Sequence, residues 1–289
     1  MILVTGAVGQ LGSDVVAELN RRKLRCMGVD MVSAPGVDVL DITNKEAVFE
    51  YIRLKQPKSI IHCAAYTAVD KAEDESELCF KVNVSGTEHL ALAAREIDAE
   101  MIYISTDYVF KGDGDEPYET DSPTEAVSIY GKSKLAGEES AHKILEKLYI
   151  VRISWVFGKT GNNFVKTMLK LAETRDELSV VSDQVGSPTY TPDLATLLCD
   201  MALSGKYGVY HATNEGFCSW AEFAELIMEL SGNNCKINHI TTAEYPTKAV
   251  RPQNSRLSKL CLDNGGFNRL PDFGDATKRF LIDFLGEVR

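Results

Sequence analysis

The sequence predicts an α/β protein in which a doubly wound parallel sheet is joined to a smaller C-terminal lobe. In the first half of the chain, short β-rich apolar segments alternate with segments of helical spacing, each roughly 10 to 15 residues long, which is the pattern of βαβ units. A length of 289 residues suits one large unit with a smaller lobe. Because such sheets bind ligands at the carboxyl ends of their strands, we expect a functional site there.

The strands of the predicted sheet follow one another along the chain. MILVTG is the first, and it breaks at Gly6 before a helix with a regular apolar face. KLRCMGVD ends at Asp30, and DVLDIT predicts a further short strand edge. KSIIHCAAY ends near Ala64 and EMIYIST ends at Ser105, with the strong helix formers of SGTEHLALAAREI between them.

After Val151 the alternation loosens, and the segments suit a smaller lobe that closes over the edge of the sheet. YIVRISWVFG and LSVVSDQVGSPTY predict strands that lead into loops. SWAEFAELIMELSG predicts a helix that begins with a capping box of Ser219 and Glu222 and stops at Gly232.

Composition excludes several classes of function. The formal net charge of -11 and the pI near 5.0 disfavour nucleic acid and anionic membrane surfaces as partners. No apolar run approaches the roughly 18 residues of a membrane span, so we expect a cytoplasmic protein without a membrane partner. Seven cysteines without a Cys-x-x-Cys pair argue against a disulfide framework, and no metal site is predicted.

TGAVGQLG places Gly6, Gly9 and Gly12 between the first strand and the first helix. Glycines permit a sharp turn and let backbone N–H groups and the helix N-terminus approach a pyrophosphate. The spacing departs from G-x-G-x-x-G, and an ordinary strand-to-helix turn also uses glycines. The position of the turn in the first βαβ unit, about twenty residues before Asp30, favours a dinucleotide site.

Asp30 is the candidate selector of the cofactor. A carboxylate at this strand end can accept the ribose hydroxyls of adenosine and repels a 2′-phosphate, although a solvated surface acid is the alternative interpretation. Asp41 is placed to meet the adenine amino group and Ile42 its ring face. No arginine directly follows Asp30, so we expect NADH or NADPH as cofactor, with NADH favoured.

YGKSK opens a predicted helix in which Tyr130 and Lys134 lie on one face and can act on one ligand. A neighbouring ammonium stabilises a phenolate and brings the pKa of the phenol nearer to neutrality, as acid-base catalysis requires. Surface helices contain such spacings by chance. The glycine turn and the hydroxyl-rich strand end of STDYVF favour the catalytic interpretation.

TGAVGQLG, STDYVF and YGKSKLAGE together resemble the extended short-chain dehydrogenases/reductases. CAAYTAVDKAE, RISWVFG, GNNFVKTML, DQVGSPTYTPDLA and RPQNSRLS, in this order, are similar to the dTDP-4-dehydrorhamnose reductase family. The resemblance implies a Rossmann domain with a discontinuous C-terminal substrate lobe. It also implies reduction of the C4 ketone of dTDP-4-dehydro-6-deoxy-L-mannose to dTDP-L-rhamnose. We accordingly assign residues 1–155, with 178–200 returning, to the Rossmann domain and 156–289 mainly to the substrate lobe.

The resemblance implies a role for each matching residue. Tyr130 would donate the proton, Lys134 would support it and anchor the ribose, and Thr106 would polarise the ketone. The residues expected at the cofactor, besides Tyr130 and Lys134, are Gly6, Gly9, Gln10, Leu11, Asp30, Asp41, Ile42, Ala65, Tyr66 and Thr67. Those expected at the sugar are Thr106, Asp107 and Trp155. Tyr66 stands where the family often has histidine, and Trp155 could equally be a core residue.

Other functions remain open at this point. Nucleotide-sugar 4,6-dehydratases resemble STDEVYG, whereas Tyr108 occupies the position of their glutamate here, and an unactivated phenol is a poor base. The alternatives to the implied reductase are another nucleotide-sugar reductase, an epimerase-type enzyme, or a non-catalytic homologue like the regulatory subunit of methionine adenosyltransferase. The expected partners are a nucleotide-sugar substrate and, as an open question, a second copy of the chain in a homodimer.

Overall fold

The computed structural model describes residues 1–286, and its centre is a parallel sheet of seven strands. The strands lie in the order β11-β6-β5-β4-β1-β2-β3, so the chain starts in the middle and winds first to one edge and then to the other. This is the predicted doubly wound arrangement. The sheet consists of β1 (Ile2–Thr5), β2 (Cys26–Asp30), β3 (Val37–Val39), β4 (Ser59–His62), β5 (Glu100–Thr106), β6 (Leu148–Ile153) and β11 (Gly208–His211).

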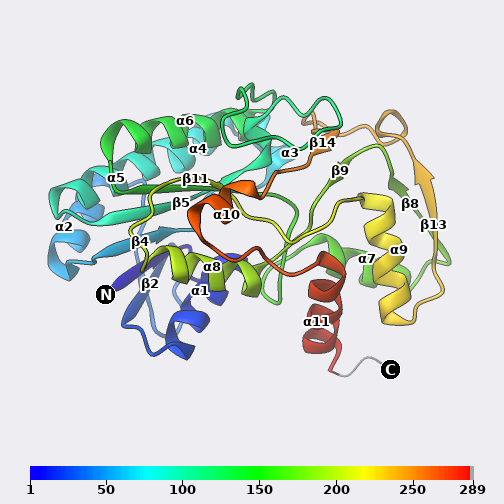
Figure 1. The fold of residues 1–289 in the computed structure, drawn as a ribbon, viewed down its shortest axis with the longest axis horizontal. Helices are drawn as coiled ribbons and strands as arrows, with labels where there is room; N and C mark the ends of the chain where they lie inside the picture. The colour runs from blue at the N-terminus through cyan, green and yellow to red at the C-terminus, as the bar shows by residue number, and fades with distance from the viewer. Residues whose placement is uncertain (287–289) are drawn as a thin grey trace.

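Helices cover both faces of this sheet (Figure 1). On one face α1 (Gln10–Arg21) packs against α8 (Thr191–Met201), and on the other α5 (Thr87–Glu96) packs against α2 (Lys45–Lys55) and α6 (Ile129–Ile144). Each face buries its own apolar cluster, as a parallel sheet requires. Short helical segments precede α5 and α6: α3 (Val69–Ala72), α4 (Ser76–Phe80), the π-helix η1 (Lys81–Gly86) and the 3₁₀ turn η2 (Asp107–Val109).

A smaller lobe lies beside the sheet and has a third apolar cluster of its own (Figure 1). Its strands form pairs and one triplet, in the orders β10-β7, β12-β9-β14 and β13-β8. The strands are β7 (Val156–Phe157), β8 (Glu177–Val181), β9 (Val185–Gly186), β10 (Thr189–Tyr190), β12 (Cys218–Ser219), β13 (Lys236–Ile240) and β14 (Asn254–Ser255). The helices are α7 (Phe164–Ala172), α9 (Trp220–Ser231), the 3₁₀ turn η3 (Thr242–Glu244) and α11 (Phe273–Leu285), whereas the short α10 (Leu260–Gly265) packs against β11 of the central sheet.

The second half of the chain passes repeatedly between lobe and sheet. The segment expected to return, 178–200, is divided: β8 pairs with β13 in the lobe, whereas α8 packs on α1. The return also continues beyond residue 200, because β11 adds the last strand of the sheet beside β6. The division of the chain at residue 155 stays a prediction.

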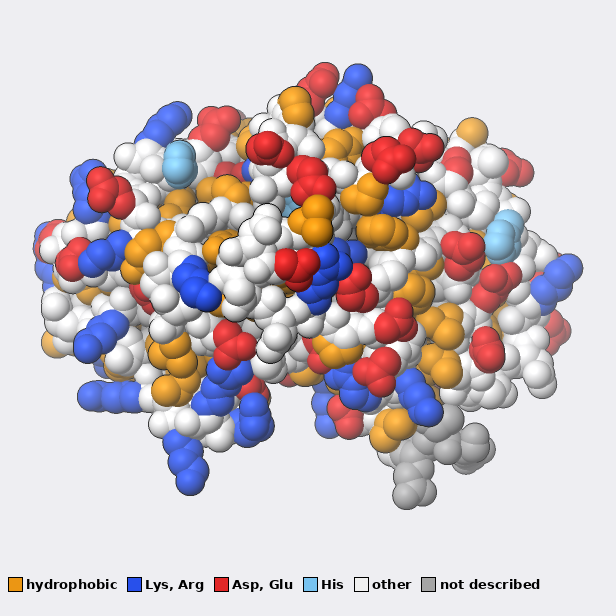
Figure 2. Space-filling model, viewed as in Figure 1, with side chains coloured by type: hydrophobic (Ala, Val, Ile, Leu, Met, Phe, Trp, Pro, Cys, Tyr) orange, Lys and Arg blue, Asp and Glu red, His pale blue; other side chains and the backbone are white. Residues whose placement is uncertain are grey.

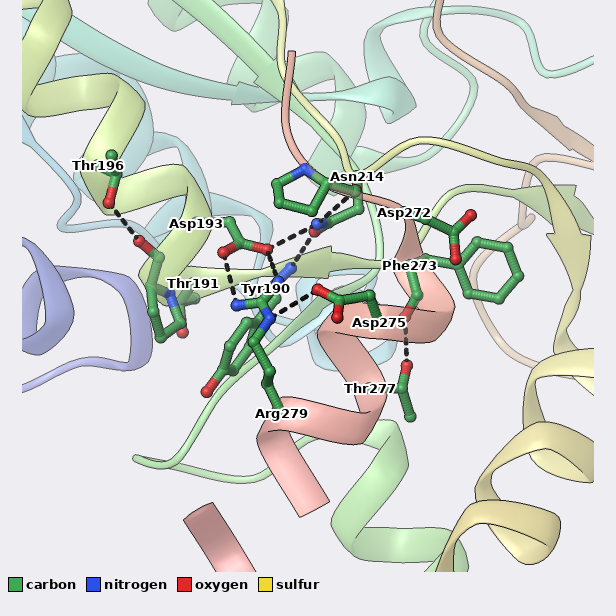
Figure 3. A network of polar contacts seen from close by, with 12 residues as sticks. Tyr190, Thr191, Asp193, Thr196, Asn214, Asp272, Phe273, Asp275, Thr277 and Arg279 are labelled. Atoms are coloured by element: carbon green, nitrogen blue, oxygen red, sulfur yellow. Dashed lines mark hydrogen bonds and ion pairs between the residues drawn. The ribbon is translucent and has the colours of Figure 1, made fainter. Parts of the chain in front are cut away.

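A polar network fastens α11 to the sheet side of the molecule (Figure 3). Arg279 on α11 donates two hydrogen bonds of 2.8 Å to Asp193 on α8. The same carboxylate accepts a hydrogen bond of 2.8 Å from Asn214, whose amide nitrogen also reaches the carbonyl of Pro271. The two parallel hydrogen bonds between Arg279 and Asp193 have the geometry of a strong charge-assisted contact. It ties the last helix of the lobe to a helix that covers the sheet.

The ends of several elements differ from the sequence expectation. β4 stops at His62, two residues before the predicted end, and β3 covers only the first part of DVLDIT and the residue before it. The predicted capping box at Ser219 and Glu222 and the stop at Gly232 are confirmed. Within residues 1–286, no helix is both long and apolar enough to cross a membrane. Acidic and basic side chains are interspersed on the face shown in Figure 2.

A buried ion pair joins α6 to β6. Arg152 donates hydrogen bonds of 3.0 and 2.8 Å to the two carboxylate oxygens of Glu138, and both side chains are about 95% buried, with 6% and 5% exposure. Arg152 also donates to the carbonyl of Thr120. The pair therefore fixes the helix that carries Tyr130 against the central sheet.

We predict that Glu138→Gln lowers the free energy of unfolding by about 3 to 5 kcal/mol, because it leaves the guanidinium of Arg152 buried without its counter-charge. The matched control is Glu96→Gln, which breaks a pair with Arg53 whose side chains are 40% and 58% exposed. That change should lower the free energy of unfolding far less, because solvent screens an exposed pair. Urea denaturation of the three proteins measures the difference, and equal costs would contradict the prediction.

Candidate active site

A cavity of about 740 Å³ lies at the carboxyl ends of β1, β2, β4, β5 and β6. Residues from the glycine turn, the ends of four more strands, η2, the start of α6 and the segment after β6 line it. The predicted site residues that line it are Gly6, Gly9, Gln10, Leu11, Asp30, Ile42, Ala65, Thr67, Thr106, Asp107, Tyr130, Lys134 and Trp155. One cavity thus brings together the residues expected at the cofactor and at the sugar.

Two predicted cofactor residues lie apart from this wall. Asp41 is exposed, and its carboxylate accepts a hydrogen bond of 2.8 Å from the amide of Thr43. The hydroxyl of Tyr66 donates a hydrogen bond of 2.6 Å to Glu75, and only the backbone of Tyr66 faces Asn83. The structure therefore does not bring these side chains to the cavity, and their roles stay predictions.

The glycine turn has the close backbone approach that the sequence predicts. Gly6 has a φ of +66°, and a Cβ atom at Gly12 would lie 2.1 Å from the carbonyl oxygen of Gly6. No larger residue fits at either position, so the turn needs both glycines. Gly9 stands at the N-cap of α1 and supplies no side-chain cap. The first amides of α1 therefore remain available for an anion, which fits the pyrophosphate of a dinucleotide.

Asp30 ends β2 directly beside the glycine turn. One carboxylate oxygen accepts a hydrogen bond of 3.0 Å from the amide of Val8, and the other accepts one of 3.2 Å from the amide of Val32. These contacts fix the carboxylate at the cavity wall and leave further lone pairs for ribose hydroxyls. Lys134 is the only lysine, and no arginine is present, among the described residues that line the cavity. The adenosine end therefore holds Asp30 without a neighbouring cation.

Tyr130 and Lys134 lie in the first turns of α6, which Ser128 caps. Burial raises the pKa of Tyr130, and the hydroxyl of Thr106 only partly opposes this rise. Burial also lowers the pKa of Lys134 to about 7, although Glu138 opposes the shift. The lysine ammonium lies 4.1 Å from the centre of the Tyr103 ring. The phenol therefore keeps its proton, instead of having its pKa lowered by the lysine as we expected.

Thr106 and Asp107 end β5 as a hydrogen-bonded pair. The hydroxyl of Thr106 donates a hydrogen bond of 2.9 Å to one carboxylate oxygen of Asp107, and Ser255 donates one of 2.5 Å to the other. Asp107 is only 3% exposed, and burial raises its pKa to about 6. Because its one proton points at Asp107, Thr106 presents a lone pair to its other neighbours while Asp107 is ionised.

Tyr108 occupies the place where a second acid would make the site a dehydratase. Its ring lies edge-on to Tyr130, with the centroids 5.4 Å apart, and burial raises its pKa. A phenol with a raised pKa holds its proton more firmly at neutral pH, which makes it a poorer base. The geometry therefore supports the sequence argument against elimination of water.

Three residues that hold the site were absent from the expected list. Ser255 reaches Asp107 from β14, 148 positions away along the chain. Asn83 is 1% exposed, and its amide holds the backbone of Tyr66 from both sides. Asn163 caps α7 and donates a hydrogen bond of 2.9 Å to the side chain of Gln10. The motifs GNNFVKTML and RPQNSRLS contain Asn163 and Ser255, but neither motif indicates which distant side chain each residue contacts.

No group of three or more histidine, cysteine, aspartate or glutamate side chains within residues 1–286 is arranged to hold a metal ion.

Comparisons with known proteins agree with this geometry. The family model described as the RmlD substrate binding domain matches residues 1–285. The spore coat polysaccharide biosynthesis protein SpsK of Bacillus subtilis is 43% identical over 97% of this chain and 96% of its own length. The dTDP-4-dehydrorhamnose reductase of Aggregatibacter actinomycetemcomitans is 42% identical over 91% of this chain and 90% of its own length. The crystal structure of dTDP-4-dehydrorhamnose reductase from Bacillus anthracis in complex with NADP has a TM-score of 0.93 and 40% identity, covering 98% of both chains.

We predict that kcat/KM for NADH falls as the pH rises above about 7 in the free enzyme. The reason is that burial lowers the pKa of Lys134 to about 7, so its ammonium is lost at higher pH. Lys134→Arg should flatten the part of this limb that lies above about pH 7, even at a lower rate, because a guanidinium stays charged, whereas deprotonation of Asp107 contributes to the fall closer to pH 6. Steady-state rates measured across roughly pH 5.5 to 9, with the circular dichroism of the folded protein recorded at each pH, provide the test. An unchanged limb in the arginine variant would assign the titration to another group.

Proposed function

The chain belongs to the family of the RmlD substrate binding domain, and from this premise we propose which of its residues carry out the family's reaction. The enzyme is an NAD(P)-dependent oxidoreductase of dTDP-L-rhamnose biosynthesis. It reduces the C4 ketone of dTDP-4-dehydro-6-deoxy-L-mannose to dTDP-L-rhamnose. The observation that supports the residue roles best is a half-buried Tyr130, whose pKa is raised by loss of hydration, in the same cavity as the glycine turn.

Tyr130 is the proposed acid. When bound, the reduced nicotinamide supplies a hydride to C4, which leaves negative charge on the former ketone oxygen. A phenol that keeps its proton in the resting site can deliver it to this oxygen as the charge develops. Lys134 is buried in the same cavity, with 3% exposure, and its ammonium stabilises the phenolate that remains. Its other donors are free for the ribose hydroxyls.

Thr106 and Asp107 are the proposed polar wall around the ketone and the neighbouring hydroxyls. While Asp107 is ionised, the hydroxyl of Thr106 donates to it and accepts from the cavity side. When Asp107 is protonated, it can donate to Thr106 and release the threonine proton towards the ketone oxygen. A pKa near 6, raised by burial, makes both states accessible close to neutral pH. Thr106 polarises the ketone in the second state.

The remaining predictions follow from the substrate and cofactor. Asp30 and Ile42 are proposed to hold the adenosine, and Ala65 and Thr67 the middle of the cofactor. We place the reaction in the cytoplasm, where nucleotide sugars and reduced nicotinamide are both present. A homodimer and a boundary of the cofactor domain at residue 155 are parts of the same proposal.

We expect Tyr130→Phe to bind NADH normally and to lose turnover by about 10²- to 10⁴-fold, which is the usual contribution of a positioned acid. Thr106→Val should cost less, about 10- to 10³-fold, since it removes one donor to the developing oxyanion while the phenol remains. NADH oxidation with dTDP-4-dehydro-6-deoxy-L-mannose measures both rates. Near-normal kcat in Tyr130→Phe would refute the assignment of the acid.

The preference between NADH and NADPH tests Asp30. Among the described residues that line the cavity there is no arginine, and the single lysine, Lys134, lies on α6 and not beside Asp30 in the sequence. No cation of the cavity wall therefore follows Asp30 to offset its repulsion of a 2′-phosphate. We expect KM to be lower for NADH than for NADPH by about 3- to 30-fold, which corresponds to about 0.7 to 2 kcal/mol. Asp30→Asn should narrow this gap, because it removes the charge and keeps an acceptor. A tenfold preference of the unmodified enzyme for NADPH would contradict this role of Asp30.

A further inference from the structure

The two tryptophans of the chain, Trp155 and Trp220, are stacked on each other. Their ring centroids lie 3.6 Å apart and their planes differ by 12°. Trp155 lines the cavity, whereas Trp220 is absent from its wall. One indole therefore faces the candidate site and the other supports it from the lobe side.

The backbone of Trp155 has an unusual conformation that sets the direction of this side chain. Its φ is +50°, in the left-handed region that bulky residues rarely adopt and that surrounding contacts must maintain. The amide of Thr189 donates a hydrogen bond to the carbonyl of Trp155, and the hydroxyl of Thr189 donates to the carbonyl of Ser154. The hydroxyl of Ser154 donates in turn to the carbonyl of Ser187. These contacts fix the backbone but leave the rotation of the indole open.

The indole itself is held by its neighbours in the lobe. A Cβ atom at Gly186 would lie 2.9 Å from Cε2 of Trp155, so the ring rests directly against the glycine backbone. The ring of Trp220 covers it at stacking distance, and Phe164 packs on Trp220 with centroids 4.5 Å apart. Trp220 begins α9, whose first turn the capping box of Ser219 and Glu222 holds. An aromatic row thus runs from the core of the lobe to the cavity.

We propose that Trp220 is a positioning residue that holds the indole of Trp155 as a flat apolar wall for the hexose of the nucleotide sugar. This inference rests on the proposed function, because it takes the sugar to lie beside Trp155. An indole face offers an apolar surface to the C–H groups of a pyranose ring, and stacking on a second ring restricts its rotation before the ligand arrives. The contact with the nucleotide part of the substrate does not depend on it.

The test compares Trp220→Leu, which keeps an apolar filling without a flat ring, with Trp220→Phe, which keeps the ring. The dissociation constant of dTDP-L-rhamnose, measured by calorimetry, should rise about tenfold in the leucine variant, which corresponds to about 1.4 kcal/mol. In the phenylalanine variant the dissociation constant of dTDP-L-rhamnose should stay within about threefold of that of the unmodified protein. The dissociation constants of dTDP and of NADH should stay within the same range in both variants. Equal affinities of the leucine variant and the unmodified protein for dTDP-L-rhamnose would overturn the proposal.

A matched control separates positioning from stability of the lobe. Phe223 lies on the same helix, is fully buried and has its centroid 6.5 Å from that of Trp220, but is absent from the cavity wall. Phe223→Leu should lower the thermal midpoint and leave the affinity for dTDP-L-rhamnose unchanged. If affinity falls with the midpoint in both leucine variants alike, Trp220 is only structural and the proposal is wrong.

Fluorescence provides a direct readout, because each substitution leaves a single tryptophan. In Trp220→Phe the remaining Trp155 should respond more strongly to dTDP-L-rhamnose than to dTDP, and in Trp155→Phe the remaining Trp220 should respond to neither. Equal responses of Trp155 to both ligands would place the sugar elsewhere and refute the inference. Absence of both dTDP-L-rhamnose binding and turnover in the unmodified protein would instead refute the proposed function on which the inference rests.

Discussion

The close approach between the glycine turn and its neighbours is the constraint on which the site depends. A Cβ atom at Gly6 would lie 2.7 Å from the backbone nitrogen of Ala64, and one at Gly12 would lie 2.1 Å from the carbonyl of Gly6. Side chains at these positions would push α1 away from the sheet and β4 away from β1. With hydrogen atoms alone, the start of α1, the end of β2 and the end of β4 meet at one edge. The cofactor end of the cavity is the space that remains there.

Burial then decides the chemistry of the other end of the cavity. Lys134 and Asp107 are each 3% exposed and Tyr130 is half-buried, so loss of hydration shifts the pKa of all three groups. In each case loss of hydration disfavours the charged form, which raises the pKa of the two acids and lowers that of the lysine. A site that favours neutral groups suits a proton donor for an alkoxide. The lobe contributes Ser255, which donates to Asp107, and Trp220, which stacks on Trp155.

The local patterns of the sequence were sufficient for the central sheet. Apolar runs that end at Asp30 and close to Ser105, with helical spacing between strands, predicted parallel strands with a site at their carboxyl ends, and this is confirmed. The motifs TGAVGQLG, STDYVF and YGKSK lie next to strand ends or helix starts, where backbone geometry is set within a few residues. For this reason Tyr130, Lys134, Thr106 and Gly9 could be placed in one cavity before the fold was known.

What only the tertiary structure decided involves contacts between distant segments. The chain alone determined the sheet and the candidate residues, because these depend on spacing within single elements, and its motifs carried the resemblance to the family. It did not show that Ser255 would reach Asp107, that Asn163 would hold Gln10, or that Trp220 would stack on Trp155. Nor did it show that the side chain of Asp41 would accept from the amide of Thr43, or that the hydroxyl of Tyr66 would donate to Glu75. Side-chain direction and burial, and therefore the pKa of Tyr130, arise only when distant segments pack together, since desolvation is a property of the assembled cavity and not of any one segment.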